Sequence, residues 1–476
     1  MKLKLQELGP EYRCFALYLS SRADLLPAEY CHELALIPDS EAALSPEVVH
    51  HILEREFGDV AKQPFAEFDY LPKRSALLTQ HHRAKLRTGA RVEVVLLRPL
   101  LYAFHERQDD GFLGMSGIEE LWDELTVLDV FADFDTAMRR KTSLLHTREG
   151  MEMLARDAAS GETLRSHLSY FELCSRNVLI FEPGESQPLD AAVIRARRGA
   201  DTLARRICHV WLQQALHGRC FPVDPRIENI HLGEDGRISF LHCELAALPA
   251  GARENLTGYL HAILAADPDK AMMYLLREMR TRSGRRIDND SLRSNFRQAA
   301  YFGMLEPILG TNSNAIAQLV FQHCRTAREH HYSPGPDLLC FYRGLLSIAR
   351  AAWQICEGGD PLREGLEEIR ACGAFDQMRE IMDWRYWQRN SDKFAAAMVH
   401  LPRIFDDALT KASSATPDSV PHEPPPASRT RASTDNLILL VVLLIAFSQL
   451  PQTHEWRGRI VPLALMLIGL LALRNR

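Results

Sequence analysis

Two uncharged apolar runs near the C-terminus set the end of this chain apart from everything before it. The runs are Leu437–Leu450 and Ile460–Leu473, with nine residues between them. Each has 14 residues, which as a helix is about 21 Å long, whereas the hydrocarbon core of a bilayer is about 30 Å thick. Neither run has the polar face of a soluble amphipathic helix. We expect a membrane-embedded hairpin over 437–476, either a double span or a shallow re-entrant form; a hairpin buried in a soluble core is the alternative.

The segment before this hairpin predicts a flexible tether. Lys411–Asn436 contains five prolines, many Ser, Thr and Ala residues, and almost no large apolar side chains. Such a segment buries too little surface to fold, and its prolines favour extended conformations. The first 410 residues must therefore contain the folded body.

Composition narrows the location and partners of that body. The formal net charge of -6 gives no overall attraction to nucleic acid or to an anionic membrane. The ten cysteines include no C-x-x-C pair, which favours a reducing compartment without a disulfide framework. The first twelve residues lack the apolar core of a signal peptide, so we expect the body to remain in the cytoplasm.

Hydrophobic periodicity predicts an α+β fold. Two islands have the character of strands, Ala90–Leu100 and Asn177–Pro183. The rest is mostly helical in period, as in Val48–Gly58, Ile118–Phe131 and Leu338–Ile355. A small mixed lobe followed by a larger helical lobe accounts for this order.

One window carries a pattern of phosphoryl-transfer chemistry. In Phe221–Glu244, Asp224 is followed five residues later by Asn229, then by a predicted hairpin, and then by His242. Protein kinases place a catalytic Asp and a magnesium-binding Asn at this spacing, and a second metal-binding Asp just past the next hairpin. The D-x-x-x-x-N spacing alone is weak, because Asp224 and Asn229 would also suit turns around Pro225.

Co-linear segments strengthen the pattern. Together they resemble the UbiB/AarF/ADCK family of atypical kinase-like proteins. The segments that carry the resemblance are the window itself, Leu5–Ala35 (N-terminal extension), Pro72–Pro99 (alanine-rich loop and third strand), His146–Glu152 (helix C), Phe171–Pro183 (hinge-side strands), Asp267–Met272 and the terminal hairpin.

The resemblance implies a protein-kinase-like, two-lobed fold with a role in ubiquinone biosynthesis. It implies ATP and Mg²⁺ as cofactors, and a membrane lipid or isoprenoid quinone precursor, together with quinone-biosynthesis proteins, as partners. The location it implies is the bacterial inner membrane, anchored at the C-terminus. The domains expected are an N-terminal helical extension (1–60), a small mixed N-lobe (61–185), a helical C-lobe (186–410), the linker (411–436) and the transmembrane hairpin (437–476).

The family's catalytic motifs are degenerate in this chain. Its K-x-G-Q signature corresponds to Cys14–Leu17, its alanine-rich loop to Arg74–Leu77, its strand lysine to Val95, and its D-F-G to His242–Glu244. A helix C acidic pair corresponds to Ser143 and Leu145. The candidate site residues carried over are Asp224 as a vestigial or actual base, Ala76, Gln80, Val95 and Glu149 at the nucleotide, and Asn229, His242 and Glu244 (a possible substitute carboxylate) at the metal.

These losses favour a pseudokinase. Val95 cannot neutralise phosphate, and an imidazole at His242 is a poor ligand for Mg²⁺, which prefers oxygen. ATP and Mg²⁺ binding are therefore doubtful. Two alternatives stay open: an active ATPase or kinase that uses Asp224 and Asn229 with rearranged metal ligands, and an interaction scaffold that binds no nucleotide. Glu149, without a lysine partner, is expected to be exposed or paired with an arginine. Adjacent histidine pairs such as His81–His82 are expected to have structural or surface roles.

Overall fold

The computed structural model describes residues 2–382 except for gaps at 23–24, 27, 60–62, 100–123, 160, 162, 185, 196–198, 282–288, 303–314 and 357. The chain divides into two compact units, Met1–Arg370 and Ala371–Arg476. The expected linker at 411–436 and the expected hairpin at 437–476 lie outside the described residues. Within the described residues, no helix combines the length and the apolar character needed to cross a membrane.

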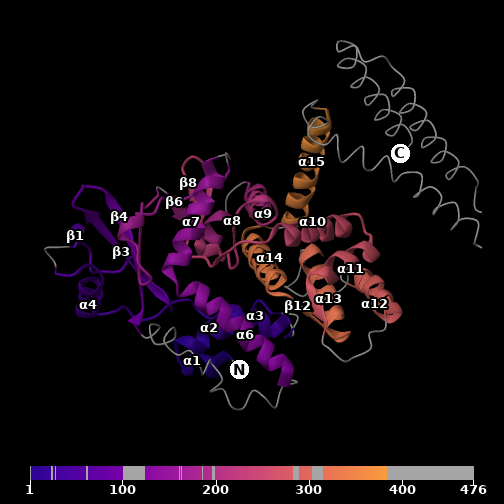
Figure 1. The fold of residues 1–476 in the computed structure, drawn as a ribbon, viewed down its shortest axis with the longest axis horizontal. Coiled ribbons are helices and arrows are strands. Elements are labelled where there is room, and N and C mark those ends of the chain that lie inside the picture. Colours follow the sequence, from indigo (N-terminus) through magenta and orange to yellow (C-terminus); the bar gives the residue numbers. More distant parts are fainter. Residues whose placement is uncertain are drawn as a thin grey trace, which may run out of the picture. The chain divides into compact units, whose positions relative to one another are not determined.

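Short helices form the N-terminal part of the first unit (Figure 1). They are α1 (Lys2–Glu7), α2 (Pro10–Leu19), α3 (Ala28–Ala35) and α4 (Pro46–Phe57). Phe15 of α2 is fully buried against Phe131 and Phe134 of α6 (Glu124–Lys141), with ring centroids 5.4 and 5.0 Å apart. Because aromatic side chains bury a large apolar area, this packing fixes α2 against α6.

An antiparallel sheet follows, in the order β1-β3-β4-β5 with β2 paired to β3. Its strands are β1 (Phe65–Phe68), β2 (Arg74–Ser75), β3 (Thr79–Leu86), β4 (Arg91–Leu97) and β5 (Val178–Phe181). The strands expected from Ala90–Leu100 and Asn177–Pro183 are confirmed as β4 and β5.

The two faces of strand β4 pack into different hydrophobic clusters of this unit. Val92, Val94 and Leu96 pack in one cluster with residues of α4, whereas Val95 and Leu97 belong to the larger core shared with the helical part. Side chains alternate across a strand, so the apolar run Val94–Leu97 contributes to both faces. Val95 thereby faces the helical part of the unit.

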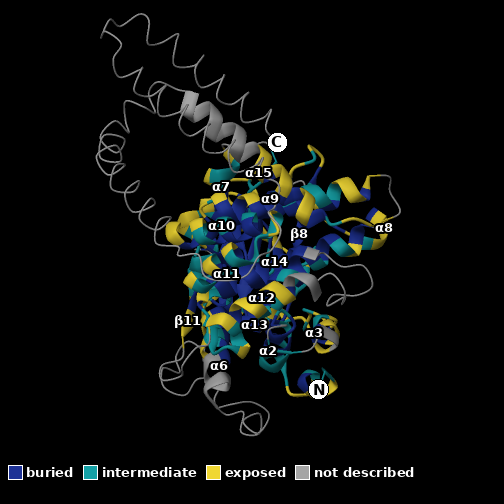
Figure 2. Ribbon diagram, turned by 90° about the vertical axis from the view of Figure 1, so that its right-hand side faces the viewer, coloured by how far each residue is buried: buried dark blue, intermediate teal, exposed yellow. Residues whose placement is uncertain are grey.

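The larger part of the unit is helical. After α7 (Leu144–Ala159) and the 3₁₀ turn η4 (Phe171–Leu173), its helices are α8 (Ala191–Arg195), α9 (Ala200–His217), α10 (Ala250–Leu264), α11 (Pro268–Arg277), α12 (Asn289–Phe302), α13 (Ala315–Glu329) and α14 (Pro336–Ile355). Helix α15 (Pro361–Met382) begins in this unit and continues past its last residue, Arg370. Strands β11 (Met279–Thr281) and β12 (Tyr332–Pro334) pair with each other. Figure 2 shows buried positions gathered in the interior around α10, α11 and α14.

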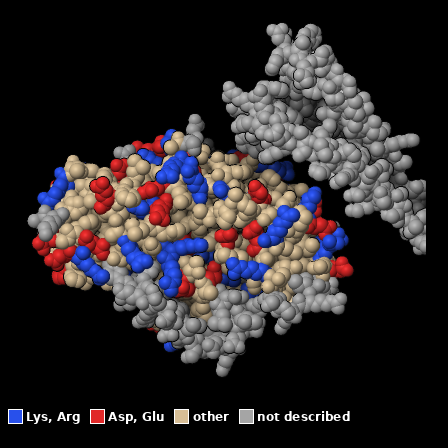
Figure 3. All heavy atoms as spheres, in the orientation of Figure 1, with Lys and Arg blue, Asp and Glu red and all other residues tan. Residues whose placement is uncertain are grey.

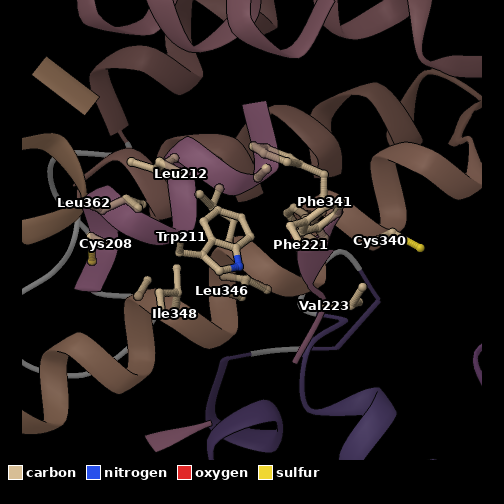
Figure 4. Packing of buried hydrophobic residues seen from close by; sticks show 14 of the residues in the cluster. Cys208, Trp211, Leu212, Phe221, Val223, Cys340, Phe341, Leu346, Ile348 and Leu362 are labelled. Carbon is tan, nitrogen blue, oxygen red and sulfur yellow. The ribbon is translucent and has the colours of Figure 1, made fainter. Parts of the chain in front are cut away.

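Trp211 of α9 is the largest fully buried side chain of this helical core. Its ring lies close to those of Phe221 and Phe341, with centroids 5.9 and 5.7 Å away (Figure 4). Its Nε1 donates a 2.8 Å hydrogen bond to the carbonyl oxygen of Pro222. The core thus holds the backbone immediately before Val223 and the loop that follows it.

Two short pairings fix that loop. β7 (Phe221–Pro222) pairs with β10 (Leu245–Ala246), and the backbone N–H of Val223 donates to the oxygen of Glu244 over 2.8 Å. Between them lie the 3₁₀ turn η5 (Ile227–Asn229) and a hairpin of β8 (Ile230–Gly233) and β9 (Ile238–Phe240), and β6 (Ser186–Pro188) adds to β8. The predicted hairpin is confirmed, with the turn at Gly233–Gly236.

Candidate functional site

A cavity of about 210 Å³ is lined by residues of α2, the sheet, α6, α7, α14 and the loops around β8 and β9. Six of the eight residues proposed from the sequence lie on its wall: Ala76, Val95, Asp224, Asn229, His242 and Glu244. Val95 and His242, the positions of the missing lysine and aspartate, therefore share one cavity. The structure brings together residues that are up to 168 positions apart in the sequence, from Ala76 to Glu244.

Gln80 and Glu149 are not on the cavity wall. Gln80 is fully buried, and its Oε1 accepts a 2.7 Å hydrogen bond from the backbone N–H of Leu44. Its amide thus ties the N-terminal segment to β3. Glu149 is exposed on α7, as expected for a carboxylate without its lysine. In this structure neither side chain is placed to touch a ligand in the cavity.

Asp224 is engaged by two groups of the protein. Its Oδ2 forms an ion pair with Nζ of Lys141 at the end of α6, and its Oδ1 accepts a 2.7 Å hydrogen bond from the backbone N–H of Glu244. Burial alone would lower the pKa of Lys141, but the carboxylates of Asp224 and Glu244 outweigh it and raise that pKa. The ammonium group is therefore charged at neutral pH and holds the carboxylate that would act as a base.

Asn229 is likewise engaged by a cation. Nη1 of Arg74 donates a 2.8 Å hydrogen bond to its Oδ1, and Nη2 of the same guanidinium lies 3.1 Å from Oδ2 of Asp39. Burial opposes ionisation of Asp39, but Arg74 and Arg226 outweigh it and hold its pKa below the usual value. Arg74 thus bridges a carboxylate and the amide oxygen that a kinase would offer to Mg²⁺.

Backbone N–H groups of the loop at 74–77 form hydrogen bonds within the protein. The N–H of Ala76 donates to the oxygen of Thr79 over 2.9 Å, and the N–H of Leu77 donates to Oδ1 of Asp39 over 3.2 Å. Arg98 donates from Nε to the oxygen of Ala76 over 2.8 Å. In a phosphate-binding loop these N–H groups would be free to bond to phosphate. Here the carboxylate of Asp39 accepts one of them instead.

Glu244 does not face the cavity as a free ligand. Its side chain has no exposed surface, and its Oε2 accepts a 2.8 Å hydrogen bond from Nη2 of Arg343 on α14. Nη1 of Arg140 lies 4.0 Å from its other oxygen. Removing a carboxylate from two guanidinium groups inside a protein is costly, so recruitment of Glu244 to a metal would disrupt this buried pair.

His242 lies beside His81 of β3 and Glu93 of β4. The two imidazole rings meet edge to face with centroids 4.1 Å apart, and Nε2 of His242 lies 3.7 Å from Oε1 of Glu93. Burial holds the pKa of His81 below, and that of His242 well below, the ordinary imidazole value. Both rings are therefore neutral at pH 7, beside a glutamate that also pairs with Lys73.

Several of these residues were not identified from the sequence. Lys141, Asp39 and Arg343 come from segments without a motif, and only the fold places their charges against Asp224, Arg74 and Glu244. His81 and His82 were expected to have structural or surface roles on the basis of their adjacency in the sequence alone. In the hairpin around the turn Arg87–Gly89, His81 lies opposite Val95 and Glu93 opposite Arg83, so this register makes His81 and Glu93 diagonal neighbours on one face of the sheet.

The family model and the curated relatives point to one family. The family model described as the ABC1 atypical kinase-like domain matches residues 37–275, a range that includes the loop with Asp224 and Asn229. The chain is 26% identical over 485 residues to "Probable protein kinase UbiB" of Pseudomonas paraeruginosa, covering 98% of this chain and 84% of the relative. It is 27% identical over 362 residues to the protein of the same name in Azotobacter vinelandii, covering 73% and 66%. Among solved structures, the complex of Rv3197 with erythromycin from Mycobacterium tuberculosis gives a TM-score of 0.41 at 18% identity, covering 61% of this chain and 74% of the other.

Proposed function

The chain belongs to the family of ABC1 atypical kinase-like domains, and on that premise we propose that it is a pseudokinase that supports ubiquinone biosynthesis or quinone-lipid handling by binding rather than by phosphoryl transfer. The family resemblance drawn from the sequence is confirmed, and the fold is kinase-like. One observation carries the proposal: the two retained polar residues, Asp224 and Asn229, are bound by the protein's own cations, Lys141 and Arg74.

Phosphoryl transfer requires a lysine on the sheet and free ligands for metal ions, and in this cavity the lysine is replaced and the candidate metal ligands are bonded to protein cations. The reaction is catalysed mostly by positioning and by neutralising phosphate oxygens with metal ions and a lysine. Here Val95 replaces the lysine, Arg74 occupies the amide oxygen of Asn229, and Asp39 takes the N–H of Leu77. Loss of one such contact commonly lowers the rate by about 10² to 10³, so the combined loss predicts negligible turnover.

The lining of the cavity supports a ligand with a polar head and an apolar body. Apolar side chains of α6 and β5, namely Phe134, Met138, Leu179 and Phe181, share the wall with the charged residues. Binding sites for small molecules combine apolar walls with a few polar groups that fix orientation. An isoprenoid quinone precursor has this chemistry, and it is the ligand class that we propose.

We also propose that the chain is anchored to the bacterial inner membrane through 437–476, with the body on the cytoplasmic side. The motivation is the pair of uncharged apolar runs in the sequence. On the face shown in Figure 3, basic and acidic side chains are interspersed, which gives no support for nucleic acid as a partner. Separation of the full chain and of a chain ending at residue 410 into membrane and soluble fractions tests this anchor.

Nucleotide binding and turnover test the pseudokinase proposal. The full chain in detergent is mixed with ATP, with and without Mg²⁺, and its thermal unfolding and phosphate release are measured. We expect no magnesium-dependent shift and no release above background. Release that disappears in Asp224→Asn would overturn the proposal and favour an active ATPase.

Lipid binding is tested separately with the same preparation. A short-chain isoprenoid quinone analogue is titrated into the full chain, and quenching of tryptophan fluorescence or a thermal shift is recorded. Met138→Glu, which places a charge on the cavity wall, is expected to weaken binding; Met153→Glu, at an exposed position of α7, is the matched control. If neither nucleotide nor lipid binds, the scaffold alternative is favoured.

A further inference from the structure

Three side chains from two parts of the fold converge beside the cavity: His81 of β3, Glu93 of β4 and His242 after β9. One nitrogen or oxygen atom of each lies within 4.8 Å of the others. We propose that this cluster, here called the His–Glu–His site, binds a divalent transition-metal ion of the zinc type. The inference does not depend on the pseudokinase proposal: His242 stands at the position of a kinase's metal-binding aspartate, but its imidazole favours a transition metal over Mg²⁺, and the other two ligands come from the sheet.

The spacing of the ligand atoms fits one small ion. Nδ1 of His81 lies 3.1 Å and Nε2 of His242 lies 3.7 Å from Oε1 of Glu93. Around a tetrahedral zinc ion with bonds of about 2.0–2.1 Å, neighbouring ligand atoms stand about 3.3 Å apart. Binding therefore requires small side-chain rotations and no movement of the strands.

The neighbours of the site are arranged as they are around bound metals. With Nδ1 of His81 on the metal, its Nε2–H would donate to Oγ1 of Thr79, 3.0 Å away. Lys73 already holds Oε2 of Glu93 over 2.6 Å and leaves Oε1 for the ion. Such outer partners fix the tautomer of a ligating histidine and the orientation of a ligating carboxylate.

His242 is held in an unusual conformation that presents its ring to the site. Its φ of 60° lies in the left-handed region, which is uncommon for residues other than glycine, although Asn, Asp and His adopt it more often than the rest. Among the described residues its ring makes no hydrogen bond, although only 12% of the side chain is exposed. The ring thus lies on the cavity wall with its nitrogens not bonded to other described side chains, as a metal ligand requires.

The ligand set selects the type of ion. Two imidazoles and one carboxylate suit zinc, iron or nickel and are unfavourable for Mg²⁺. Three protein ligands leave a further coordination position, as in catalytic rather than structural zinc sites. Since His81 and His242 line the cavity, that position is accessible to water or to a ligand oxygen within it. The ammonium of Lys73 repels the ion, so we expect an affinity below that of structural zinc sites.

Metal titration tests the proposal on the full chain. The protein is freed of metal with a chelator, and Zn²⁺ is titrated calorimetrically; Co²⁺ is then added and its visible absorption is recorded. We expect one saturable Zn²⁺ and the absorption bands of low-coordinate Co²⁺. His242→Asn, which tolerates a left-handed φ, and Glu93→Gln, which keeps the shape of the side chain, should each weaken binding at least tenfold.

A matched control separates this site from adventitious histidines. His51 is exposed on α4, outside the cluster, and His51→Ala should bind Zn²⁺ like the unmodified chain. Thermal unfolding without metal shows whether each variant is folded. Absence of saturable binding in the unmodified chain would overturn the proposal, as would equal affinity and equal Co²⁺ spectra in folded His242→Asn and Glu93→Gln.

Discussion

Arg74 and Asn229 are 155 positions apart in the sequence, and a 2.8 Å hydrogen bond joins Nη1 of the first to Oδ1 of the second. The same guanidinium binds Asp39, whose other oxygen accepts the N–H of Leu77. Arg74 thus bonds to an oxygen that would bind a metal ion in a kinase. Asp39 bonds to a backbone N–H of the loop that would bind phosphate. Under the pseudokinase proposal, these contacts would stabilise the cavity without ATP and compete with its binding.

The bridge made by Arg74 predicts a loss of stability when it is removed. In Arg74→Met, Asp39 loses its first cation and Asn229 its partner, and we expect the free energy of unfolding to fall by about 1–3 kcal/mol. The partial exposure of the pair, 23% and 25%, keeps the loss below that of a fully buried pair. Urea unfolding of the full chain measures it.

The control for this change is Arg83→Met. Arg83 is exposed on the same strand as His81, and its replacement should change stability by at most about 0.5 kcal/mol. A double variant, Asp39→Asn with Arg74→Met, should be less destabilised than the two single changes summed. Equal stability of the two arginine variants would contradict the structural role given to Arg74.

The buried pair of Glu244 and Arg343 predicts a larger effect. The exposed fractions of the two side chains are 0% and 5%, so removal of Arg343 would leave Glu244 as a buried charge with only Arg140, 4.0 Å away, to offset it. Arg343→Met should cost about 3–5 kcal/mol of unfolding free energy, and Glu244→Gln with Arg343→Met should recover part of it. The exposed pair of Arg325 and Glu329 is the matched control, and Arg325→Met should have little effect.

The parts of this fold that follow local patterns were predictable from the sequence. Strand β4 contains the apolar run Val94–Leu97, β5 is apolar throughout, and the β8–β9 hairpin has alternating apolar residues on both sides of a Gly-containing turn. β3 was missed because Thr79–Leu86 has no apolar alternation; its buried Gln80, His81 and His82 are polar and satisfied by tertiary contacts.

The candidate site was predictable only where the family pattern reached. Asp224, Asn229 and His242 stand at known spacing, so their meeting in one cavity followed from the resemblance. The contacts of Asp224 with Lys141 and of Asn229 with Arg74 did not follow from it, because the partners are distant in the sequence and no local pattern marks them. Physical reasoning did predict the exposure of Glu149, since a carboxylate without a lysine partner is costly to bury.

Buried histidines predict a loss of stability in acid. His323 of α13 is 1% exposed, its Nδ1 lies 3.0 Å from the hydroxyl of Tyr259, and burial lowers its pKa to about 3. An unfolded chain takes up this proton near the ordinary pKa of about 6.5, so stability is complete above that pH and falls as the pH decreases towards 3. The slope for one such group is about 1.4 kcal/mol per pH unit.

Urea midpoints of the full chain at pH 7.5, 6.0 and 5.0 measure this slope. His323→Asn keeps an acceptor for the Tyr259 hydroxyl but does not titrate, so its stability should fall less steeply over the same range. Burial also lowers the pKa of His231, to about 4, so part of the slope should remain in the variant. Identical slopes in both proteins would show that His323 is not a neutral, buried group.

Restoring the family's lost charges should not by itself restore catalysis. In Val95→Lys with His242→Asp, a lysine and an aspartate return to the cavity, and aspartate tolerates the left-handed φ of 60° at position 242. Arg74 still holds Asn229, Lys141 still holds Asp224, and Asp39 still holds the N–H of Leu77. We therefore expect no magnesium-dependent phosphate release from ATP above that of the unmodified chain, with circular dichroism to verify folding.

Adding Arg74→Ala to the double variant removes the partner of Asn229. A magnesium-dependent thermal shift with ATP should first be seen in that triple variant. Hydrolysis by the double variant would show that the internal ion pairs open readily and do not limit this cavity.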